Sequence, residues 1–329
     1  MRQTIAMVHG SGGQATGDLI RDVFAKAFNN DTLNMMEDSA AVPGSGTIAI
    51  TTDSFVVTPL EFAGGDIGRL CVCGTVNDLL MRGAKPEYIT CGAILEEGLD
   101  VEVLRRVISS MAETAREAGV QVVAGDTKVI EGHGGMYINT AGVGFIEHGT
   151  VSAGGARPGD AILVSGTMGD HHAAILGERM SIETDIKSDC APLTEIVRGL
   201  QEGGIHIHAM RDITRGGLAT VLKELAEASG QQFVIDEELI PVTPKVRDFC
   251  GMLGLDPLYM GNEGKLAAIV PEEEAERALA IMRHARYGEN AVRIGTVTDG
   301  KEGQLIMRTE IGGERVLDIL QGEGLPRIC

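Results

Sequence analysis

The sequence predicts a two-domain protein of the α/β (α+β) class. Short β-prone runs alternate with amphipathic helical patterns along most of the chain, an order that packs helices against sheets. The chain has 329 residues, enough for two domains of ordinary size. Its 43% apolar and 23% charged residues are typical of a globular protein with a packed core.

The first half contains several predicted elements in sequence. The clearest is a helix that runs from an Asp100 cap to a Gly119 stop, with apolar residues at helical spacing between them. The other predicted elements of this half are a helix over 17–28, a β-prone run over 47–51, a stretch over 66–81 whose small and apolar residues share one face, and a buried strand over 120–124.

A glycine-rich stretch without periodicity, residues 152–160, is a candidate domain boundary. After it we expect a strand over 161–165, helices over 169–179 and 217–229, and another helix after Pro271. An alternation of strands and helices therefore resumes after the boundary.

These patterns divide the chain into an N-terminal domain, residues 1–155, a C-terminal domain, residues 156–320, and a tail, residues 321–329. The tail contains two glycines and a proline, so we expect it to be mobile.

The composition excludes some classes of partner. With 28 basic and 47 acidic side chains the net charge is −19, which disfavours nucleic acid and anionic membrane surfaces. No apolar run approaches the roughly 20 residues of a membrane span, and the first residues lack a secretory signal. The six cysteines form no CxxC pair or zinc pattern, so we expect a cytoplasmic protein with reduced thiols.

Four aspartates, Asp38, Asp53, Asp78 and Asp126, are expected where strands give way to loops or helices. Carboxylates gathered at strand ends suit Mg²⁺, which prefers oxygen ligands and shares them with phosphates. Helix caps and turns are the alternative, because aspartate is common in both. Lys128 would place a cation beside a metal–phosphate cluster, or is an ordinary surface lysine.

Two glycine-containing loops are weaker candidates. The run His9-Gly-Ser-Gly-Gly13 includes Gly12 and Gly13, whose backbone amides are suited to a phosphate, yet it is neither a Walker A motif nor a Rossmann fingerprint. A flexible N-terminal turn is the alternative. In Asn262-Glu263-Gly264 the glutamate is either a general base on a tight turn or a turn residue.

The last residue is a cysteine, Cys329. A thiol at the end of a mobile tail gains nothing from burial and is chemically reachable, so it is a candidate reactive group. The alternative is an accidental exposed cysteine, which soluble proteins generally avoid because it oxidises. The other five cysteines lie in apolar stretches and are expected to pack as small core residues.

Several segments together resemble one family over residues 9 to 329. They are His9-Gly-Ser-Gly-Gly-Gln14, Thr52-Asp-Ser54, Gly65-Asp-Ile-Gly68, Cys73-Gly-Thr-Val-Asn-Asp78, Gly125-Asp-Thr-Lys-Val129, Arg211-Asp-Ile-Thr-Arg-Gly-Gly217, Asn262-Glu-Gly-Lys265 and Pro326-Arg-Ile-Cys329. The chain thereby resembles the HypE hydrogenase maturation factors of the aminoimidazole ribonucleotide synthetase (PurM-like) superfamily. The terminal Pro-Arg-Ile-Cys is the most specific of these segments.

The resemblance implies a PurM-like fold, in which N-terminal strands of two copies form a barrel across a homodimer axis. It also implies ATP in the cleft between domains, with Mg²⁺ on the matching positions Asp38, Asp53, Asp78 and Asp126. The nucleotide would further contact Gly12, Gly13, Lys128 and Asn262.

The implied reaction is ATP-dependent dehydration of a carbamoyl group on Cys329 to a thiocyanate, by way of an O-phosphorylated intermediate. Glu263 or Asp78 would do the acid–base work, and Lys128 would stabilise the oxygen that is phosphorylated. The implied partners are the carbamoyltransferase HypF and the iron-carrying HypC–HypD complex. The alternatives are a superfamily enzyme acting on a free small molecule, which has no use for Cys329, and a non-catalytic carrier, which needs no phosphate site.

Overall fold

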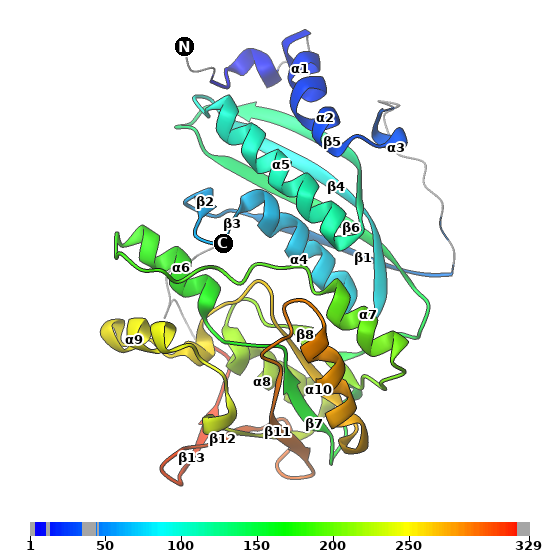
Figure 1. Cartoon of the computed structure of the whole chain (residues 1–329), viewed down its shortest axis with the longest axis vertical. Helices are drawn as coiled ribbons and strands as arrows, with labels where there is room; N and C mark the ends of the chain where they lie inside the picture. Colours follow the sequence, from blue (N-terminus) through cyan, green and yellow to red (C-terminus); the bar gives the residue numbers. More distant parts are fainter. Residues whose placement is uncertain (1–3, 11–13, 35–43, 45, 321–329) are drawn as a thin grey trace.

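The computed structural model describes residues 4–10, 14–34, 44 and 46–320. Two sheets dominate this part of the chain, one of four strands from the first half and one of seven strands from the second (Figure 1). A two-stranded hairpin of β2 (Glu61–Phe62) and β3 (Gly65–Asp66) precedes the first long helix. The α+β arrangement predicted from the sequence is confirmed.

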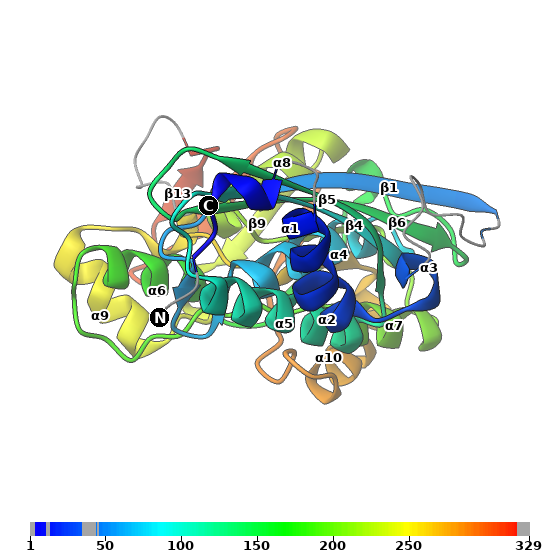
Figure 2. The ribbon, with the colours of Figure 1, turned by 90° about the horizontal axis from the view of Figure 1, so that it is seen from above.

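The four-stranded sheet has the order β1-β6-β4-β5. Its strands are β1 (Thr47–Phe55), β6 (Met136–Ile146), β4 (Ala84–Glu96) and β5 (Gln121–Ile130). The β4–β5 pair is parallel, and the other pairs are antiparallel. Helices α4 (Ile67–Met81) and α5 (Val101–Ala118) cover one face of this sheet (Figure 2).

The opposite face of the four-stranded sheet is open. Ile48 is 51% exposed and Ile50 is 73% exposed, although both belong to a regular strand. Ile94 and Ile130 are also exposed on this face, at 41% each. A sheet face with this many accessible apolar side chains is typical of a protein–protein interface.

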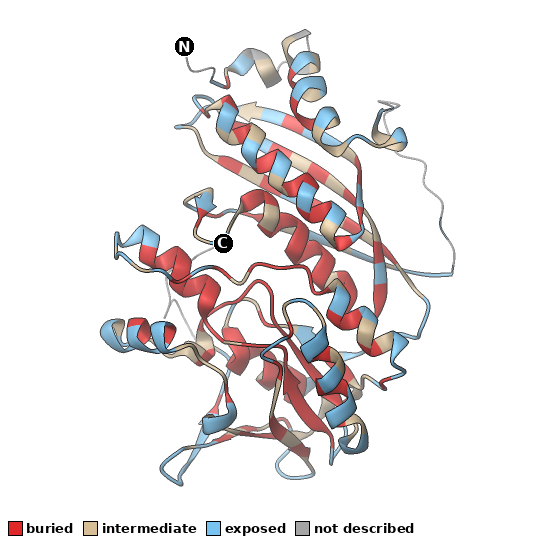
Figure 3. Ribbon diagram, in the orientation of Figure 1, coloured by how far each residue is buried: buried red, intermediate tan, exposed pale blue. Residues whose placement is uncertain are grey.

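Helix α4 is buried along almost its whole length (Figure 3). Glycines allow the close approach this requires: a β-carbon on Gly68 would lie 2.1 Å from the carbonyl oxygen of Val107 in α5. One on Gly74 would lie 2.8 Å from the ring of Phe55 in β1. The small residues that share a face in the sequence therefore bring α4 against both neighbours.

Helix α5 has the predicted ends. The Asp100 carboxylate accepts a hydrogen bond from the Glu102 amide at 2.9 Å, and Gly119 ends the helix with φ of 75°, a conformation that glycine adopts at little cost. The predicted first helix is also present, as α1 (Gln14–Leu19), a π-helical turn (Ile20–Ala25) and α2 (Lys26–Phe28).

The seven-stranded sheet has the order β13-β12-β9-β11-β7-β10-β8 and is antiparallel except between β12 and β9. The strands are β7 (Ala161–Val164), β8 (Ala209–Asp212), β9 (Gln232–Asp236), β10 (Leu266–Val270), β11 (Val292–Thr298), β12 (Leu305–Arg308) and β13 (Glu314–Leu317). The helices of this half are α6 (Asp170–Arg179), α7 (Thr194–Glu202), α8 (Gly217–Ser229), α9 (Pro244–Leu253) and α10 (Ala275–His284).

The strand-end placement of the candidate aspartates is wrong for the three that are described. Asp53 lies inside β1, Asp126 lies inside β5, and Asp78 lies in the last turn of α4. The predicted strand over 120–124 continues to Ile130, because pairing with β4 carries it past residues of low β propensity. That partner strand had not been predicted.

A segment of the second half without regular secondary structure, between α6 and α7, packs against the first half. We call residues 186–193 the connecting segment; most of it is buried, and it lies along α4. Asn77 of α4 donates to the Ala191 carbonyl at 3.1 Å and accepts from the Leu193 amide at 2.9 Å. One cluster of buried apolar residues extends from α4 and α5 through this segment to α7 and α10.

No helix in the described part of the chain is long and apolar enough to span a membrane. The division at residues 155 and 156 stays a prediction, because the two halves share the apolar cluster just described.

Candidate active site

Two of the candidate aspartates lie together on the helix-covered face of the four-stranded sheet. The Thr51 hydroxyl of β1 donates to Asp78 Oδ2 at 2.8 Å, and Asp53 Oδ2 lies 3.2 Å from where a β-carbon on Gly74 would be. Burial raises the pKa of both carboxyls above their usual range. The charge of Asp78 raises the pKa of Asp53 further, and the charges of Arg215 near Asp53 and Arg211 near Asp78 offset these rises only in part.

A third carboxylate belongs to this group, and the sequence reasoning missed it. Asp212 ends β8, and burial followed by the charge of Asp78 raises its pKa to about 7. Asp78 and Asp212 line a cavity of about 390 Å³ between the two halves, with Arg211 and Arg215 also on its wall. Asp212 lies in the Arg211–Gly217 segment that carries part of the family resemblance. That resemblance was the only feature of the sequence that pointed to this residue.

Glu263 lies in the loop that precedes β10 and is only 7% exposed. Burial raises its pKa well above the usual range, and the charges of Asp212 and Asp189 add to this effect. A carboxylate in such a place binds a proton more tightly than a free glutamate, which makes it the stronger base.

The Asn262 side chain forms hydrogen bonds within the protein. It is fully buried, accepts a hydrogen bond from the Gly169 amide at 2.8 Å and donates to the Met260 carbonyl at 3.4 Å. These bonds fix the loop ahead of Glu263. Its expected contact with a nucleotide stays a prediction.

Asp126 and Lys128 lie on the open face of the sheet. Across the sheet Asp126 is in register with Gly92, Asn139 and Ser54, whereas Asp53 is in register with Thr140, whose side chain bonds to α4. The Lys128 ammonium lies 2.6 Å from Asp126 Oδ1, and this contact lowers the pKa of Asp126. Within one copy of the chain, Asp126 and Lys128 are therefore not brought together with Asp53 and Asp78.

Four predicted site residues, Gly12, Gly13, Asp38 and Cys329, lie outside the described residues. The five other cysteines are described and all are buried, as predicted for core residues: Cys71, Cys73, Cys91, Cys190 and Cys250.

Among the residues with described positions, no three His, Cys, Asp or Glu side chains are placed to hold a metal ion by themselves. The raised pKa values of Asp53 and Asp78 show that a cation would be favourable beside them. Mg²⁺ commonly binds through one or two carboxylates with phosphate oxygens and water completing its shell. The pair therefore fits a magnesium ion that arrives with a nucleotide.

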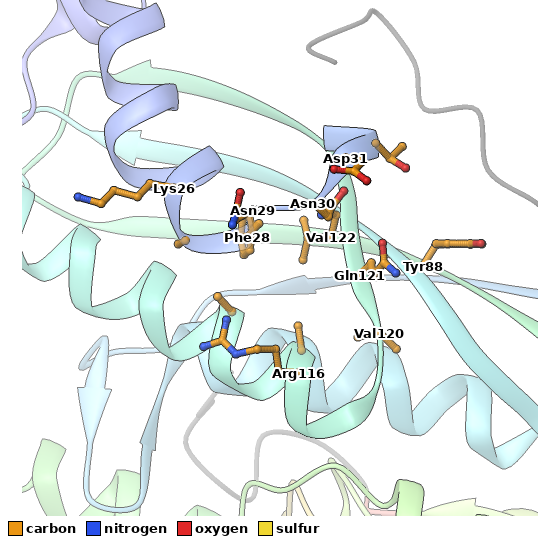
Figure 4. A pocket seen from close by; sticks show the side chains of 14 residues that line it. Lys26, Phe28, Asn29, Asn30, Asp31, Tyr88, Arg116, Val120, Gln121 and Val122 are labelled. Carbon is orange, nitrogen blue, oxygen red and sulfur yellow. The ribbon is translucent and has the colours of Figure 1, made fainter. Parts of the chain in front are cut away.

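A more voluminous cavity, of about 910 Å³, lies elsewhere, between α2, α3 (Asp31–Asn34), α5 and β5 (Figure 4). Lys26, Asn30 and Arg116 are among the residues on its wall. None of the candidate residues lines this cavity, so it is not part of the candidate site despite its larger volume.

Comparisons with known proteins cover nearly the whole chain. Residues 36–146 match the family "AIR synthase related protein, N-terminal domain" and residues 157–308 match its C-terminal counterpart. The carbamoyl dehydratase HypE of Cupriavidus necator is 50% identical over 99% of this chain and 95% of its own length.

Solved structures agree with this relationship. The hydrogenase maturation protein HypE in complex with ATP has a TM-score of 0.95 and 49% identity, over 99% of this chain and 100% of that one. A HypE–HypF complex has a TM-score of 0.80 and 46% identity, over 92% of this chain and 99% of that one. The chain therefore belongs to the HypE family of carbamoyl dehydratases, the hydrogenase maturation members of the AIR synthase related proteins.

Proposed function

We propose that this protein uses ATP to dehydrate a carbamoyl group on its own Cys329 to a thiocyanate. The carbonyl oxygen of the thiocarbamate attacks the γ-phosphorus of ATP, and ADP leaves. Loss of both protons from the carbamoyl nitrogen then expels phosphate, which carries away the former carbonyl oxygen, and a C≡N group remains on sulfur. The sum is the loss of one water from the carbamoyl group and the hydrolysis of one ATP.

The observation that carries this proposal is the buried Glu263. Burial raises its pKa, the charges of Asp212 and Asp189 add to the rise, and this suits a group that must accept a proton from nitrogen. Asp78 is the weaker candidate for this role, because the hydrogen bond from the Thr51 hydroxyl opposes the rise that burial causes in the pKa of its carboxyl. We therefore assign the acid–base work to Glu263.

Nucleotide binding is assigned to the cavity beside Asp78. A related HypE has been solved with ATP, and the pKa values of Asp53 and Asp78 stay raised despite the nearby charges of Arg211 and Arg215. Asp53 and Asp78 would hold Mg²⁺, which neutralises phosphate charge as the phosphoryl group is transferred. Arg211 and Arg215 on the same wall would contact phosphate oxygens. Asp38, Gly12, Gly13 and Asn262 remain in the proposed nucleotide site on the family resemblance alone.

The end of the described chain is well placed to deliver Cys329 to Glu263. The Leu320 amide donates to Thr220 of α8 at 3.3 Å, and the Tyr259 hydroxyl donates to the Asp318 carbonyl at 3.1 Å. Tyr259 is four residues from Glu263 in the sequence. Nine residues follow Leu320 in the sequence, enough for a span of at most about 30 Å, and we propose that they carry the thiol to Glu263 of the same chain. Delivery within one chain raises the effective concentration of the carbamoyl group.

We further propose that two copies associate through the open face of the four-stranded sheet. The exposed isoleucines on β1, β4 and β5 support this assembly. In such a homodimer Asp126 and Lys128 lie at the interface. They would then be available to a nucleotide held by the partner copy, with Lys128 beside the oxygen that is phosphorylated.

The proposed partners are a HypF carbamoyltransferase, which loads Cys329, and a HypC–HypD complex, which receives the cyano group. A HypE–HypF complex of a related protein supports the first of these. We place the reaction in the cytoplasm, where thiols stay reduced, and we retain the division into an N-terminal nucleotide-binding domain and a C-terminal domain.

The decisive experiment follows the carbamoyl oxygen. Cys329 is loaded with an ¹⁸O-labelled carbamoyl group by a HypF protein, ATP is added, and both the tail and inorganic phosphate are analysed by mass spectrometry. We expect the label in phosphate and a tail lighter by the elements of water. Label found in water instead would remove the phosphorylated intermediate. Cys329→Ala should abolish product while ATP binding persists.

A further inference from the structure

The backbone around Glu263 is held from two sides. On one side, the Asn262 amide donates to the Ile213 carbonyl at 3.2 Å, and the Ile213 amide donates to the Lys265 carbonyl at 2.8 Å. Ile213 directly follows Asp212, so these bonds tie the loop to the end of β8.

On the other side the connecting segment holds the same loop. The Glu263 amide donates to Asp189 Oδ1 at 3.1 Å, and the Ala191 amide donates to the Glu263 carbonyl at 3.2 Å. The fit is tight, because a β-carbon on Gly264 would lie 2.0 Å from the Asp189 carbonyl oxygen. The Asp189 side chain thus binds the Glu263 amide directly.

Asp189 is buried, with 5% of its side chain exposed, and it pairs with an equally unusual partner. The Lys265 ammonium, 10% exposed, lies 3.1 Å from Asp189 Oδ2 and donates to the Gly264 carbonyl at 3.2 Å. A buried ion pair is often no more stabilising than apolar residues of the same volume. Stability alone therefore does not explain why an aspartate stands here.

The connecting segment is in turn fixed to α4. Arg69 donates to the Cys190 carbonyl at 2.8 Å, and Asn77, the neighbour of Asp78, binds the backbone of Ala191 and Leu193. The segment therefore links the helix that carries Asp78 to the loop that carries Glu263.

We propose that Asp189 is a positioning residue that holds Glu263 in place for proton transfer by accepting a hydrogen bond from its amide. The inference rests on the proposed function, since it concerns the group assigned there as the base. It adds a residue that acts through the Glu263 backbone.

Two double variants isolate this hydrogen bond. Asp189→Asn with Lys265→Met keeps an acceptor for the Glu263 amide, whereas Asp189→Leu with Lys265→Met has none. Both remove the buried ion pair completely, so neither leaves an isolated charge. The exposed pair of Asp185 and Lys245 provides a matched control, Asp185→Asn with Lys245→Met, near the same segment.

Each protein is loaded at Cys329 and converted in a single turnover at saturating ATP, followed by intact mass. We expect the asparagine variant to convert within about threefold of the wild-type rate and the leucine variant about 100-fold more slowly, because displacing a reacting group by 1 Å costs that much. The ATP concentration that gives half the maximal rate should stay within twofold in both, and the control should match the wild type.

Equal rates in the two double variants, whether both fast or both slow, would overturn the proposal. If the leucine variant does not fold, the asparagine variant tests the proposal by itself. Because it keeps an acceptor for the Glu263 amide, a rate below a third of wild type would contradict the proposed role of that hydrogen bond. Glu263→Gln is measured in parallel. Full activity of that variant would refute the base assignment, whereas a slow Glu263→Gln beside equally fast double variants would refute only the role of Asp189.

Discussion

The two faces of the four-stranded sheet carry acidic residues in opposite electrostatic states. On the helix-covered face Asp53 and Asp78 are partly buried, close to each other and to Asp212, and their pKa values are raised. On the open face Asp126 is 68% exposed and paired with Lys128, and its pKa is lowered. Residues that look equivalent in the sequence are therefore not equivalent in the molecule.

The difference separates a binding surface from an assembly surface. Partly buried carboxylates that lie close together cost folding energy, part of which the protein recovers when a metal cation binds. An exposed ion pair such as Asp126–Lys128 changes the free energy of folding little. It lies on the same face as the accessible isoleucines, so we expect it to become important when two copies associate.

The largest effect is expected at the open face. Ile50→Glu would bury an unpaired charge in both copies of the proposed dimer, weakening association by about 1,000-fold with no loss of fold in the monomer. Light scattering at micromolar concentration should change from twice the 34.7 kDa chain mass to once that mass. If the variant keeps the dimer mass, the interface does not include Ile50. If the wild-type protein itself has the mass of one chain, the proposed dimer does not form.

On the covered face, Asp53→Asn should weaken Mg·ATP binding by about 100-fold, because it removes a ligand of the proposed metal site. Without nucleotide, the same variant should be more stable than the wild type, since burial and Asp78 make the charged form of Asp53 unfavourable. Titration calorimetry and thermal unfolding measure the two effects. Lower stability together with unaltered ATP affinity would show a structural role instead.

Asp212 gives the comparison a pH dependence. Its folded pKa of about 7 exceeds the ordinary value of 3.8, so its contribution to stability is complete below pH 3.8 and is lost as the pH rises through 7. In the absence of ATP and Mg²⁺, Asp212→Asn should therefore match the wild type near pH 4 and be more stable at pH 8. We expect a gain of about 2 kcal/mol, roughly half the free energy that the full pKa shift corresponds to, because Asp212 is only partly buried and water screens its charge. Urea denaturation measures the stability of both proteins at each pH. A stability difference between variant and wild type that does not change with pH would contradict this prediction.

The smallest effect is expected for Asp126→Asn. Its ion pair is exposed, so stability should change by less than about 0.5 kcal/mol, and ATP affinity should fall only severalfold. A loss of affinity as large as that of Asp53→Asn would place both faces in one nucleotide site. Since the faces are separate within a chain, such a site would contain residues of two copies.

The local signals in the sequence were sufficient for α5, whose cap, stop and periodicity agree, and for the burial of the five internal cysteines. They were insufficient for β4 and β6, because both are long strands defined by pairing across the sheet more than by alternation. The faces of Asp53 and Asp126 depend on the register of four strands, which no local pattern contains. The grouping of Asp212 with Asp78 likewise requires contact between the two halves, so only the family resemblance marked its segment.

The connecting segment has a consequence for how the protein unfolds. Irregular segments usually open easily and exchange their amide hydrogens quickly. This one is held by Asn77 and Arg69 and lies within the apolar cluster that crosses between the halves. Its amides should therefore exchange as slowly as those of α4, through global opening alone. We therefore expect the two halves to unfold together as one cooperative unit.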